Sequence, residues 1–372
     1  MIYADNAATT KLDPDALEAA MPFLLDEYGN ASQPYLFAKS AKEAIADARK
    51  TIAACIGAKP EEIYFTSGGT ESDNWAIKGS AFSDKKKRTT ITSEIEHHAI
   101  LNACAAIERH GFPVTYLPVT DEGVVQPKKL ETYITDRTRL VSIMMANNEI
   151  GTIEPIAELV KITHEHGALF HTDAVQAVGH IPIDVKKLGV DMLSASAHKF
   201  GGMKGSGFLY IRNGVSLSPF ADGGSQEHGR RAGTENVAAI VAMAVALKKN
   251  CDRMEETTQK LRKLSQIFIE ALTAVGIDYR LNGSSNHLPG NVNISIRGAE
   301  GEMLLHRMDL KGICISTGSA CDSVNTRSSH VIEAIHVPEE YAEGTIRVTF
   351  GAENTEKEAV TIAESLIDIL KK

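Results

Sequence analysis

The sequence predicts an α/β fold: a large domain with a mostly parallel sheet flanked by helices, and a smaller C-terminal α+β domain. Apolar strand-like runs alternate with amphipathic helical stretches between about residues 60 and 200, and such β-α-β alternation indicates a parallel sheet. A long helical region at 236–274 is followed by short strand-like runs and a closing helix to Lys372. We therefore expect an N-terminal arm at 1–15, a large domain at 16–260 and a small domain at 261–372.

The expected elements follow in order along the chain. Strand-like runs lie at 62–65, 88–95, 113–119, 139–147, 168–175 and 191–198, and helical patterns begin at about Glu71 and lie at 97–111, 127–134 and 156–167. The small domain shows strand-like runs at 291–296, 312–317 and 345–350. Ligands collect at the carboxyl ends of parallel strands. Polar clusters around Asn148, Asp173 and Lys199 each sit at such an end, so they should face one crevice.

The composition indicates a globular protein and argues against several classes of partner. The 372 residues are 43% hydrophobic and 23% charged, as in an ordinary globular protein. A net charge of -9 argues against nucleic acid as a direct partner. No apolar run is long enough to span a membrane and the start does not resemble a signal peptide. Five scattered cysteines form no zinc-ligand spacing, so we expect free thiols, no metal site and a cytoplasmic protein.

A glycine-rich turn follows the first strand-like run. The stretch "TSGGTESDN" places Gly68, Gly69 and Thr70 at the start of a helix, where backbone N–H groups and a hydroxyl can bind a phosphate. Taken alone, such a turn is more often a plain helix cap. It is not a P-loop, because no GKS or GKT follows it.

Asp173 and Lys199 end two apolar runs. Either residue alone is most simply a polar side chain at a strand end. Together with the glycine-rich turn, they match the needs of pyridoxal phosphate, which requires a Schiff-base lysine, an acid partner for its pyridinium nitrogen and a phosphate cup.

Nine motifs carry a resemblance that covers nearly the whole chain: "YADNAATT", "TSGGTESDN", "EHHAI", "NNEIGT", "HTDAVQ", "SASAHK", "RRAGTEN", "STGSAC" and "IRVTFG". The sequence resembles the cysteine desulfurases of the nitrogen-fixation and iron–sulfur-assembly type, within the fold-type I pyridoxal-phosphate enzymes. The combination of SAHK with STGSAC is the most specific part.

The resemblance implies a role for each residue around the ring of the cofactor. Lys199 would carry the cofactor and act as a base, Asp173 would pair with the pyridinium nitrogen, and Gln176 would hydrogen-bond the ring hydroxyl. His97 would stack on the ring and assist proton transfers. His98 fits the simpler role of a histidine at a helix start.

The resemblance also implies the contacts to the phosphate and the substrate. The phosphate would be held by small and polar residues, namely Gly69, Thr70, Ser196, His198 and, in a homodimer with shared sites, Thr234 of the partner subunit. Asn148 would contact the cofactor and, with Arg347, the substrate carboxylate. An arginine in such a strand would otherwise face solvent.

Cys321 corresponds to the nucleophile of the family. It lies among small polar residues that suit a mobile loop, whereas Cys314 lies in an apolar run and fits a structural role. The implied reaction takes sulfur from L-cysteine, leaves L-alanine and a persulfide on Cys321, and passes the sulfur to an acceptor protein. A selenocysteine lyase, a class-V aminotransferase and a non-catalytic sulfur carrier remain as alternatives. The sequence departs from the family pattern at Tyr35, Ala38, Met203, Ser225 and His228, so the contacts at the site entrance stay open.

Overall fold

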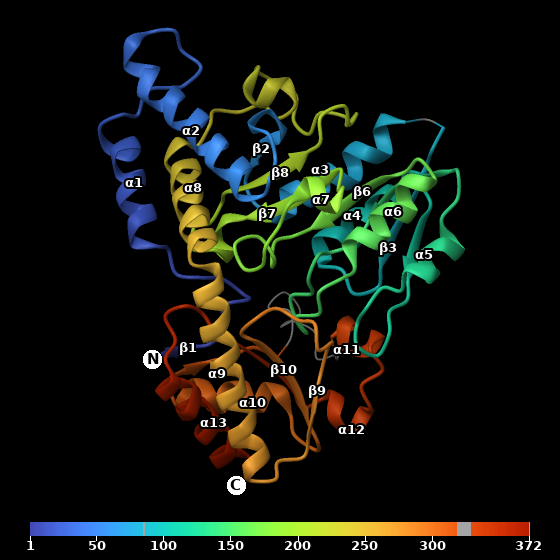
Figure 1. The fold of residues 1–372 in the computed structure, drawn as a ribbon, viewed down its shortest axis with the longest axis vertical. Coiled ribbons are helices and arrows are strands. Elements are labelled where there is room, and N and C mark those ends of the chain that lie inside the picture. The colour runs from blue at the N-terminus through green and yellow to red at the C-terminus, as the bar shows by residue number, and fades with distance from the viewer. Residues whose placement is uncertain (85, 318–328, 372) are drawn as a thin grey trace.

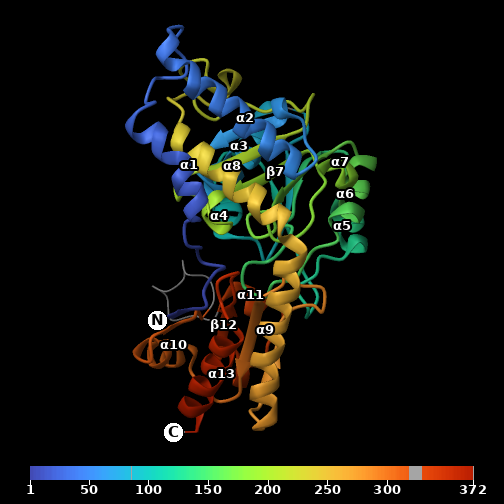
Figure 2. The ribbon, with the colours of Figure 1, turned by 60° about the vertical axis from the view of Figure 1, so that its left-hand side comes forward.

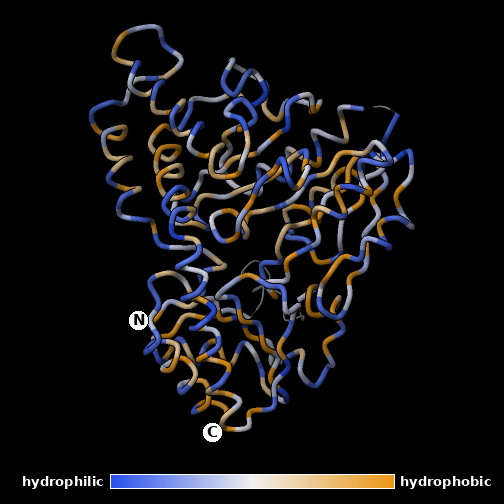
Figure 3. The backbone as a smooth tube through the Cα atoms, in the orientation of Figure 1, coloured by the Kyte–Doolittle hydropathy of each residue, from blue (hydrophilic) through white to orange (hydrophobic). Residues whose placement is uncertain are grey.

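A computed structural model describes residues 1–84, 86–317 and 329–371. Figures 1 and 2 show a large lobe that carries the central sheet and a smaller lobe that contains both chain ends. Each lobe encloses a hydrophobic core of its own, and Figure 3 shows apolar segments running through the interior of both. In the described parts of the chain, no helix combines the length and the apolar character that crossing a membrane requires.

The large lobe is built on a seven-stranded sheet in the order β2-β8-β7-β6-β5-β3-β4. Its strands are β2 Ile63–Thr66, β3 Thr89–Ser93, β4 Val114–Leu117, β5 Thr138–Ser142, β6 Leu169–Asp173, β7 Met192–Ser196 and β8 Gly207–Ile211. Strands β3 to β7 run parallel, whereas β8 runs antiparallel to both of its neighbours. The mostly parallel sheet is thus confirmed. Strand β8 was not among the expected runs.

Helices cover both faces of this sheet, and successive residues of a strand belong to different cores. In β5, Leu140 packs with the core that includes α3 and α4, and Val141 packs with the core that includes α2, α6 and α8. The helices of this lobe are α1 Pro14–Leu25, α2 Lys39–Cys55, α3 Gly69–Ser83, α4 His98–Arg109, α5 Pro127–Tyr133, α6 Ile156–Glu165, α7 Val185–Leu188 and α8 Val237–Asp252. Burial on both faces explains why the strands read as continuous apolar runs.

The helical region expected at 236–274 is two helices. Helix α8 ends at Asp252 and α9 spans Met254–Ala274, with Arg253 between them at φ -108° and ψ 9°. Figure 1 shows the two helices running from the large lobe into the small one. Leu261 and Leu264 of α9 pack in the core of the small lobe. The division of the chain near Lys260 stays a prediction.

The small lobe contains a three-stranded antiparallel sheet in the order β12-β10-β9. Its elements are β9 Tyr279–Leu281, β10 Asn291–Ile296, α10 Gly301–Leu310, β11 Ile313–Cys314, α11 His330–Ala334, α12 Glu339–Ala342, β12 Thr345–Thr349 and α13 Glu356–Leu370. The N-terminal strand β1 Ile2–Tyr3 pairs in parallel with β11. The start of the chain is therefore bound to the small lobe before it passes to the large one.

Candidate active site

Two of the three polar residues expected at strand ends, Asp173 and Lys199, lie at the ends of adjacent strands, whereas β5 already ends at Ser142, six residues before Asn148. Asp173 is the last residue of β6 and Ser196 the last residue of β7, and Lys199 closes the short 3-10 turn that follows. The parallel register pairs Asp173 with Ser194. The sheet therefore brings a lysine and an aspartate to one edge.

The N-terminal arm lies against this edge and accepts hydrogen bonds from it. The Lys199 Nζ donates to the carbonyl oxygens of Ala7 and Ala8 at 2.5 and 2.9 Å. The Gln176 amide also donates to the Ala7 oxygen, at 2.9 Å. These carbonyls hold a half-buried lysine without neutralising its charge. This function of the arm was not expected from the sequence, because the hydrogen bonds join residues more than 160 positions apart.

Asp173 is buried, with 5% of its surface exposed. Its Oδ1 accepts a hydrogen bond from the Val175 backbone N–H at 2.9 Å. Burial raises the pKa of this carboxyl to about 6, while the Val175 bond and the nearby Lys199 charge pull it down. The site therefore favours a cationic partner beside Asp173.

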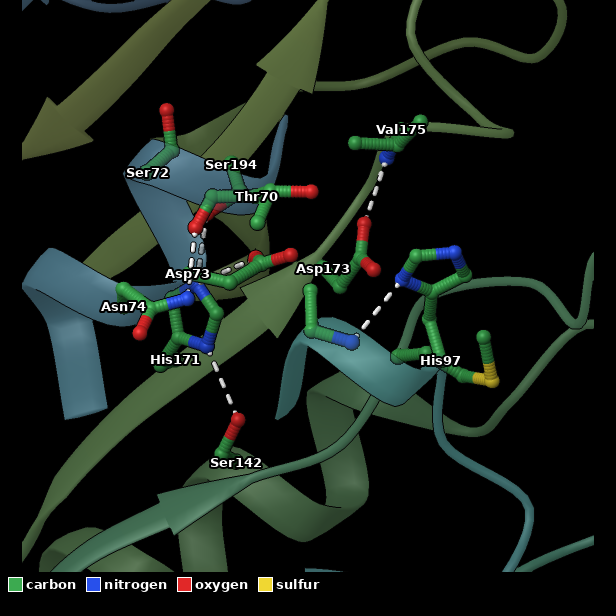
Figure 4. A network of polar contacts seen from close by, with 12 residues as sticks. Thr70, Ser72, Asp73, Asn74, His97, Ser142, His171, Asp173, Val175 and Ser194 are labelled. Atoms are coloured by element: carbon green, nitrogen blue, oxygen red, sulfur yellow. Dashed lines mark hydrogen bonds and ion pairs between the residues drawn. The ribbon is translucent and has the colours of Figure 1, made fainter. Parts of the chain in front are cut away.

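His97 caps the start of α4 and lies beside Asp173 (Figure 4). Its Nδ1 accepts a hydrogen bond from the Ala99 N–H at 3.1 Å, so a neutral ring carries its proton on Nε2. His97, Asp173 and a third residue, Asp73, place a nitrogen or oxygen atom each within 4.8 Å of one another. The structure thus brings His97 and Asp173 together, as expected.

The glycine-rich turn packs closely beneath the same edge. Gly68 has φ +148°, which favours glycine. A Cβ on Gly69 would lie 2.6 Å from Val175 Cγ2, and one on Gly68 would lie 3.5 Å from Ser196 Oγ. The first N–H groups of α3, which starts at Gly69, have no partner within the helix. Gly69, Thr70 and Ser196 therefore border one small space with donors available to an anion.

His198 borders this region as a neutral ring. Its Nδ1 is 3.1 Å from the Thr9 hydroxyl. Burial, together with the charges of Lys199 and Lys204, lowers the pKa of His198 to about 4. At neutral pH it can therefore donate or accept one hydrogen bond but adds no positive charge.

Arg347 is buried in the small lobe, with 1% exposed. Its Nη1 donates to the Asn148 carbonyl oxygen at 2.9 Å and its Nη2 to Asp5 Oδ1 at 2.8 Å. Its Nε has no hydrogen-bond partner in the described part of the chain. Arg347 and Asn148, the two residues expected to bind the substrate carboxylate, are thus in contact with each other, and their binding of a substrate stays a prediction. Asp5, in the motif "YADNAATT", is a further partner that the sequence analysis did not identify.

Two expected site residues are not part of this cluster. Thr234 is exposed and precedes α8. A mobile loop is expected at 317–329, and its residues 318–328, with Cys321 among them, lie outside the described residues.

The departures at Ser225 and His228 lie in a short turn before Thr234. His228 and its neighbour Glu227 have φ of 58° and 42°, in the left-handed region. Arg49 binds both carboxylate oxygens of Glu227, at 2.7 and 2.8 Å, and holds this unusual backbone in place.

Two buried carboxyls near the site were also missed. Asp73 lies in α3 and Glu96 lies just before His97, and both are almost fully buried. Glu96 Oε1 accepts from the Ser93 hydroxyl at 2.6 Å and from the Met144 N–H at 3.0 Å, and burial raises its pKa to about 8. In the sequence both look like solvent-facing acids near a helix start.

The comparisons with known proteins agree on one family. The class-V aminotransferase family matches residues 2–361. The cysteine desulfurase IscS of Methanosarcina thermophila is 48% identical over 372 residues, which cover 100% of this chain and 92% of that protein. The cysteine desulfurase IscS of Dictyoglomus turgidum is 50% identical over 373 residues, with coverages of 100% and 95%.

Solved structures give the same result. A NifS-like protein superposes with a TM-score of 0.94 at 37% identity and covers 100% of this chain and 99% of its own. A structure described as SspA in complex with cysteine has a TM-score of 0.84 at 35% identity, with coverages of 94% and 99%. The chain belongs to the class-V aminotransferase family and, within it, to the cysteine desulfurases.

Proposed function

We propose that this protein uses pyridoxal phosphate to remove sulfur from L-cysteine, giving L-alanine and a persulfide on Cys321. One observation supports the proposal most directly: Lys199, Asp173 and the glycine-rich turn lie together at one edge of the sheet. The family membership supports the same activity.

The residues at this edge fit the cofactor. Asp173 is a buried carboxylate whose raised pKa favours a cationic partner, as a pyridinium N–H would be. A Cβ on Gly69 would occupy part of the space beside Gly68 and Gly69. The N-terminus of α3 supplies backbone N–H donors for a phosphate in this space. We assign the phosphate to Gly69, Thr70, Ser196 and His198, and the ring to Asp173, Gln176, His97 and Asn148.

When bound, pyridoxal phosphate supplies an electron sink for the carbanion formed at the substrate Cα. The Lys199 amine takes the Cα proton and can return it. Its two carbonyl partners in the arm keep Nζ in place while it does so. His97 presents its Nε2–H to the site, since its Nδ1 is occupied by the Ala99 N–H. This makes His97 a second group that can deliver a proton.

The substrate and its sulfur are handled by residues of the small lobe. Arg347 and Asn148 bind the substrate carboxylate in this proposal, and the Nε of Arg347 is a buried donor still available to it. The Cys321 thiolate attacks the substrate sulfur. The bond between sulfur and Cβ breaks, an S–S bond forms on Cys321, and protonation of the remainder gives alanine. One sulfur atom moves, so the step needs no external oxidant.

We further propose a homodimer in which the partner subunit's Thr234 completes each phosphate site. The exposure of Thr234 in the single chain supports this arrangement. The persulfide sulfur then passes to an acceptor protein for iron–sulfur clusters or thiolated products, and we expect a cytoplasmic protein that contacts neither nucleic acid nor membrane directly.

The test is incubation with L-cysteine, with alanine, sulfide and the mass of the peptide containing Cys321 measured together. Stoichiometric alanine with a gain of one sulfur on Cys321 is the expected result. Unmodified Cys321 beside a persulfide on Cys314 or Cys104 would refute the assignment.

The alternatives give different results in simple experiments. A class-V aminotransferase would stay active after Cys321→Ala, whereas the proposed enzyme would stop. A selenocysteine lyase would release selenide from selenocysteine but no sulfide from cysteine. A non-catalytic carrier would lack the visible absorbance of a lysine Schiff base.

A further inference from the structure

A buried carboxyl that the proposed chemistry does not use lies next to Asp173. Asp73 is 1% exposed, and its Oδ1 has no hydrogen-bond partner in residues 1–84, 86–317 and 329–371. Carboxylate oxygens of Asp73 and Asp173 lie within 4.8 Å of each other. Two negative charges this close in a buried site oppose each other's ionisation. The pair should therefore carry a single negative charge.

The surroundings decide which carboxyl is charged. Asp173 accepts the Val175 N–H and feels the positive charge of Lys199. Burial raises the pKa of Asp73 first, and the nearby Asp173 carboxylate raises it further. The hydrogen bond with Ser194 lowers this pKa and the Glu96 carboxylate raises it, and the net effect is a pKa well above the usual value. Asp73 is therefore the carboxyl that keeps its proton.

His171 does not supply the missing positive charge. Its ring is fully buried, and burial lowers its pKa to about 3, so it is neutral. Its Nε2 is 3.8 Å from Asp73 Oδ1, too far for a direct hydrogen bond. His97, the other histidine near this pair, lies on the far side toward Asp173 (Figure 4).

A chain of hydrogen bonds links Asp73 to the sheet. The Asp73 carboxyl hydrogen-bonds the Ser194 hydroxyl. The Ser194 oxygen is 2.9 Å from His171 Nε2, and His171 Nδ1 is 2.8 Å from the Ser142 hydroxyl. Figure 4 shows this network extending from α3 to residues of β7, β6 and β5.

The proton on Asp73 sets the direction of every bond in this chain. If neutral Asp73 donates to Ser194, the serine hydroxyl must donate to His171 Nε2, and the histidine proton must be on Nδ1. If Asp73 were ionised, Ser194 would donate to it, and the histidine proton would be on Nε2. The tautomer of His171 thus reports the protonation of Asp73.

We propose that Asp73 is a positioning residue for Asp173 that works as a neutral acid, donating to Ser194 and leaving the negative charge of the pair on Asp173. The inference rests on the proposed function in one respect: the negative charge on Asp173 is proposed to bind the pyridinium nitrogen of the cofactor. The order of protonation is a property of the cofactor-free protein and can be tested there.

The first test is ¹⁵N NMR of cofactor-free protein labelled at histidine, at pH 7. The signals of His171 are those that disappear in His171→Gln. We expect the Nδ1–H tautomer in the wild type and in Asp73→Asn, whose amide also donates. The Nε2–H tautomer in the wild type would overturn the proposal, and this result does not depend on any Asp73 variant folding.

The second test is the pH dependence of unfolding of cofactor-free protein. A carboxyl with a raised folded pKa stabilises the fold at low pH, and this stability is lost as pH rises above the unfolded value of about 3.9. Asp73→Asn does not titrate, so it should gain stability over wild type between pH 4 and 7. The other ionisable groups near Asp73 are present in both proteins, namely Asp173, Glu96, His97, His171 and Lys199.

The matched control is Asp136→Asn, an aspartate whose side chain is fully exposed and 3.9 Å from His166. An ion pair this exposed contributes little to stability, so this variant should follow the wild type closely. Lower stability of Asp73→Asn than wild type at pH 7 would mean that an ionised Asp73 is an acceptor, and would overturn the proposal.

The cofactor gives the third measurement. Asp73→Asn should bind pyridoxal phosphate with an unchanged dissociation constant, whereas Ser194→Ala, which removes the acceptor of the Asp73 proton, should weaken binding. Weaker binding in Asp73→Asn would overturn the positioning role. The NMR and unfolding results can be as expected while neither the wild type nor any variant desulfurates cysteine. In that case the proposed function is wrong, but the conclusion that Asp73 is protonated and Asp173 is ionised still holds.

Discussion

Replacing Gly69 with alanine tests how tightly the phosphate turn is coupled to Asp173. The new Cβ would lie 2.6 Å from Val175 Cγ2 and 3.6 Å from Ser196 Cβ. Carbon atoms pack at about 3.5–4.0 Å, so the valine methyl must retreat by roughly 1 Å. The β-branched side chain of Val175 is restricted at χ1, so its backbone is expected to move, and its N–H is the donor to Asp173.

The expected size follows from two opposing effects. Adding a methyl to a well-packed site costs about 1–3 kcal/mol, and alanine for glycine returns about 0.4–1 kcal/mol by restricting the unfolded chain. The cofactor-free Gly69→Ala protein should therefore lose roughly 1–2 kcal/mol of unfolding free energy. Cofactor binding should weaken as well, by about tenfold for each 1.4 kcal/mol lost from the bound site.

The assay is a double-mutant cycle with Val175→Ala, which removes the methyl group that would clash with the new Cβ of residue 69. Denaturant unfolding and absorbance titration with pyridoxal phosphate are measured for the wild type, both single variants and the pair. Gly69→Ala should be harmful in the wild type and nearly neutral when residue 175 is alanine. Effects that add to within about 0.5 kcal/mol would refute the coupling between Gly69 and Val175.

Three further predictions concern the assigned residues. Lys199→Ala should fold but lose all turnover, and borohydride reduction of the wild type should fix the cofactor to Lys199; fixation to another lysine would exclude the assignment. Cofactor affinity should fall as pH is lowered through about 6, because protonation of Asp173 removes the charge that binds the pyridinium nitrogen; in Asp173→Asn, titrated in parallel, the affinity should be low at every pH. Diluting the protein until it is monomeric should loosen the cofactor if Thr234 of the partner subunit binds the phosphate, and an unchanged affinity in the monomer would contradict the shared site.

The sequence was sufficient for features that depend on local pattern. Strands buried on both faces are continuous apolar runs, so β6 and β7 could be placed and Asp173 and Lys199 recognised at their ends. The antiparallel strand β8 has the same kind of run, "GFLYI", but a strand that follows its neighbour without a helix does not fit the βαβ pattern. The break at Arg253 has no glycine or proline to mark it. It depends on the two helices packing in different cores.

The sequence was insufficient where a role depends on burial by distant residues. Asp73 stands in "TESDN" among polar residues of a helix start, where an exposed acid is the usual expectation. It is buried because α3 packs against the sheet, where it contacts β5, β6, β7 and β8, which no local pattern reveals. The motif "HTDAVQ" drew attention to Asp173, while His171, two residues earlier on the same face of β6, was left without a role.

The arm at the start of the chain links these observations. Its strand β1 pairs with β11 of the small lobe and ends at Tyr3. Four and five residues later, the carbonyl oxygens of Ala7 and Ala8 accept hydrogen bonds from Lys199 of the large lobe. Between these points Asp5 binds Arg347, the proposed substrate clamp. One short segment therefore contacts both the proposed base and the proposed carboxylate clamp. Because carbonyl oxygens accept hydrogen bonds without taking a proton, the arm can hold Lys199 in place in either protonation state, as a residue that must gain and lose a proton requires.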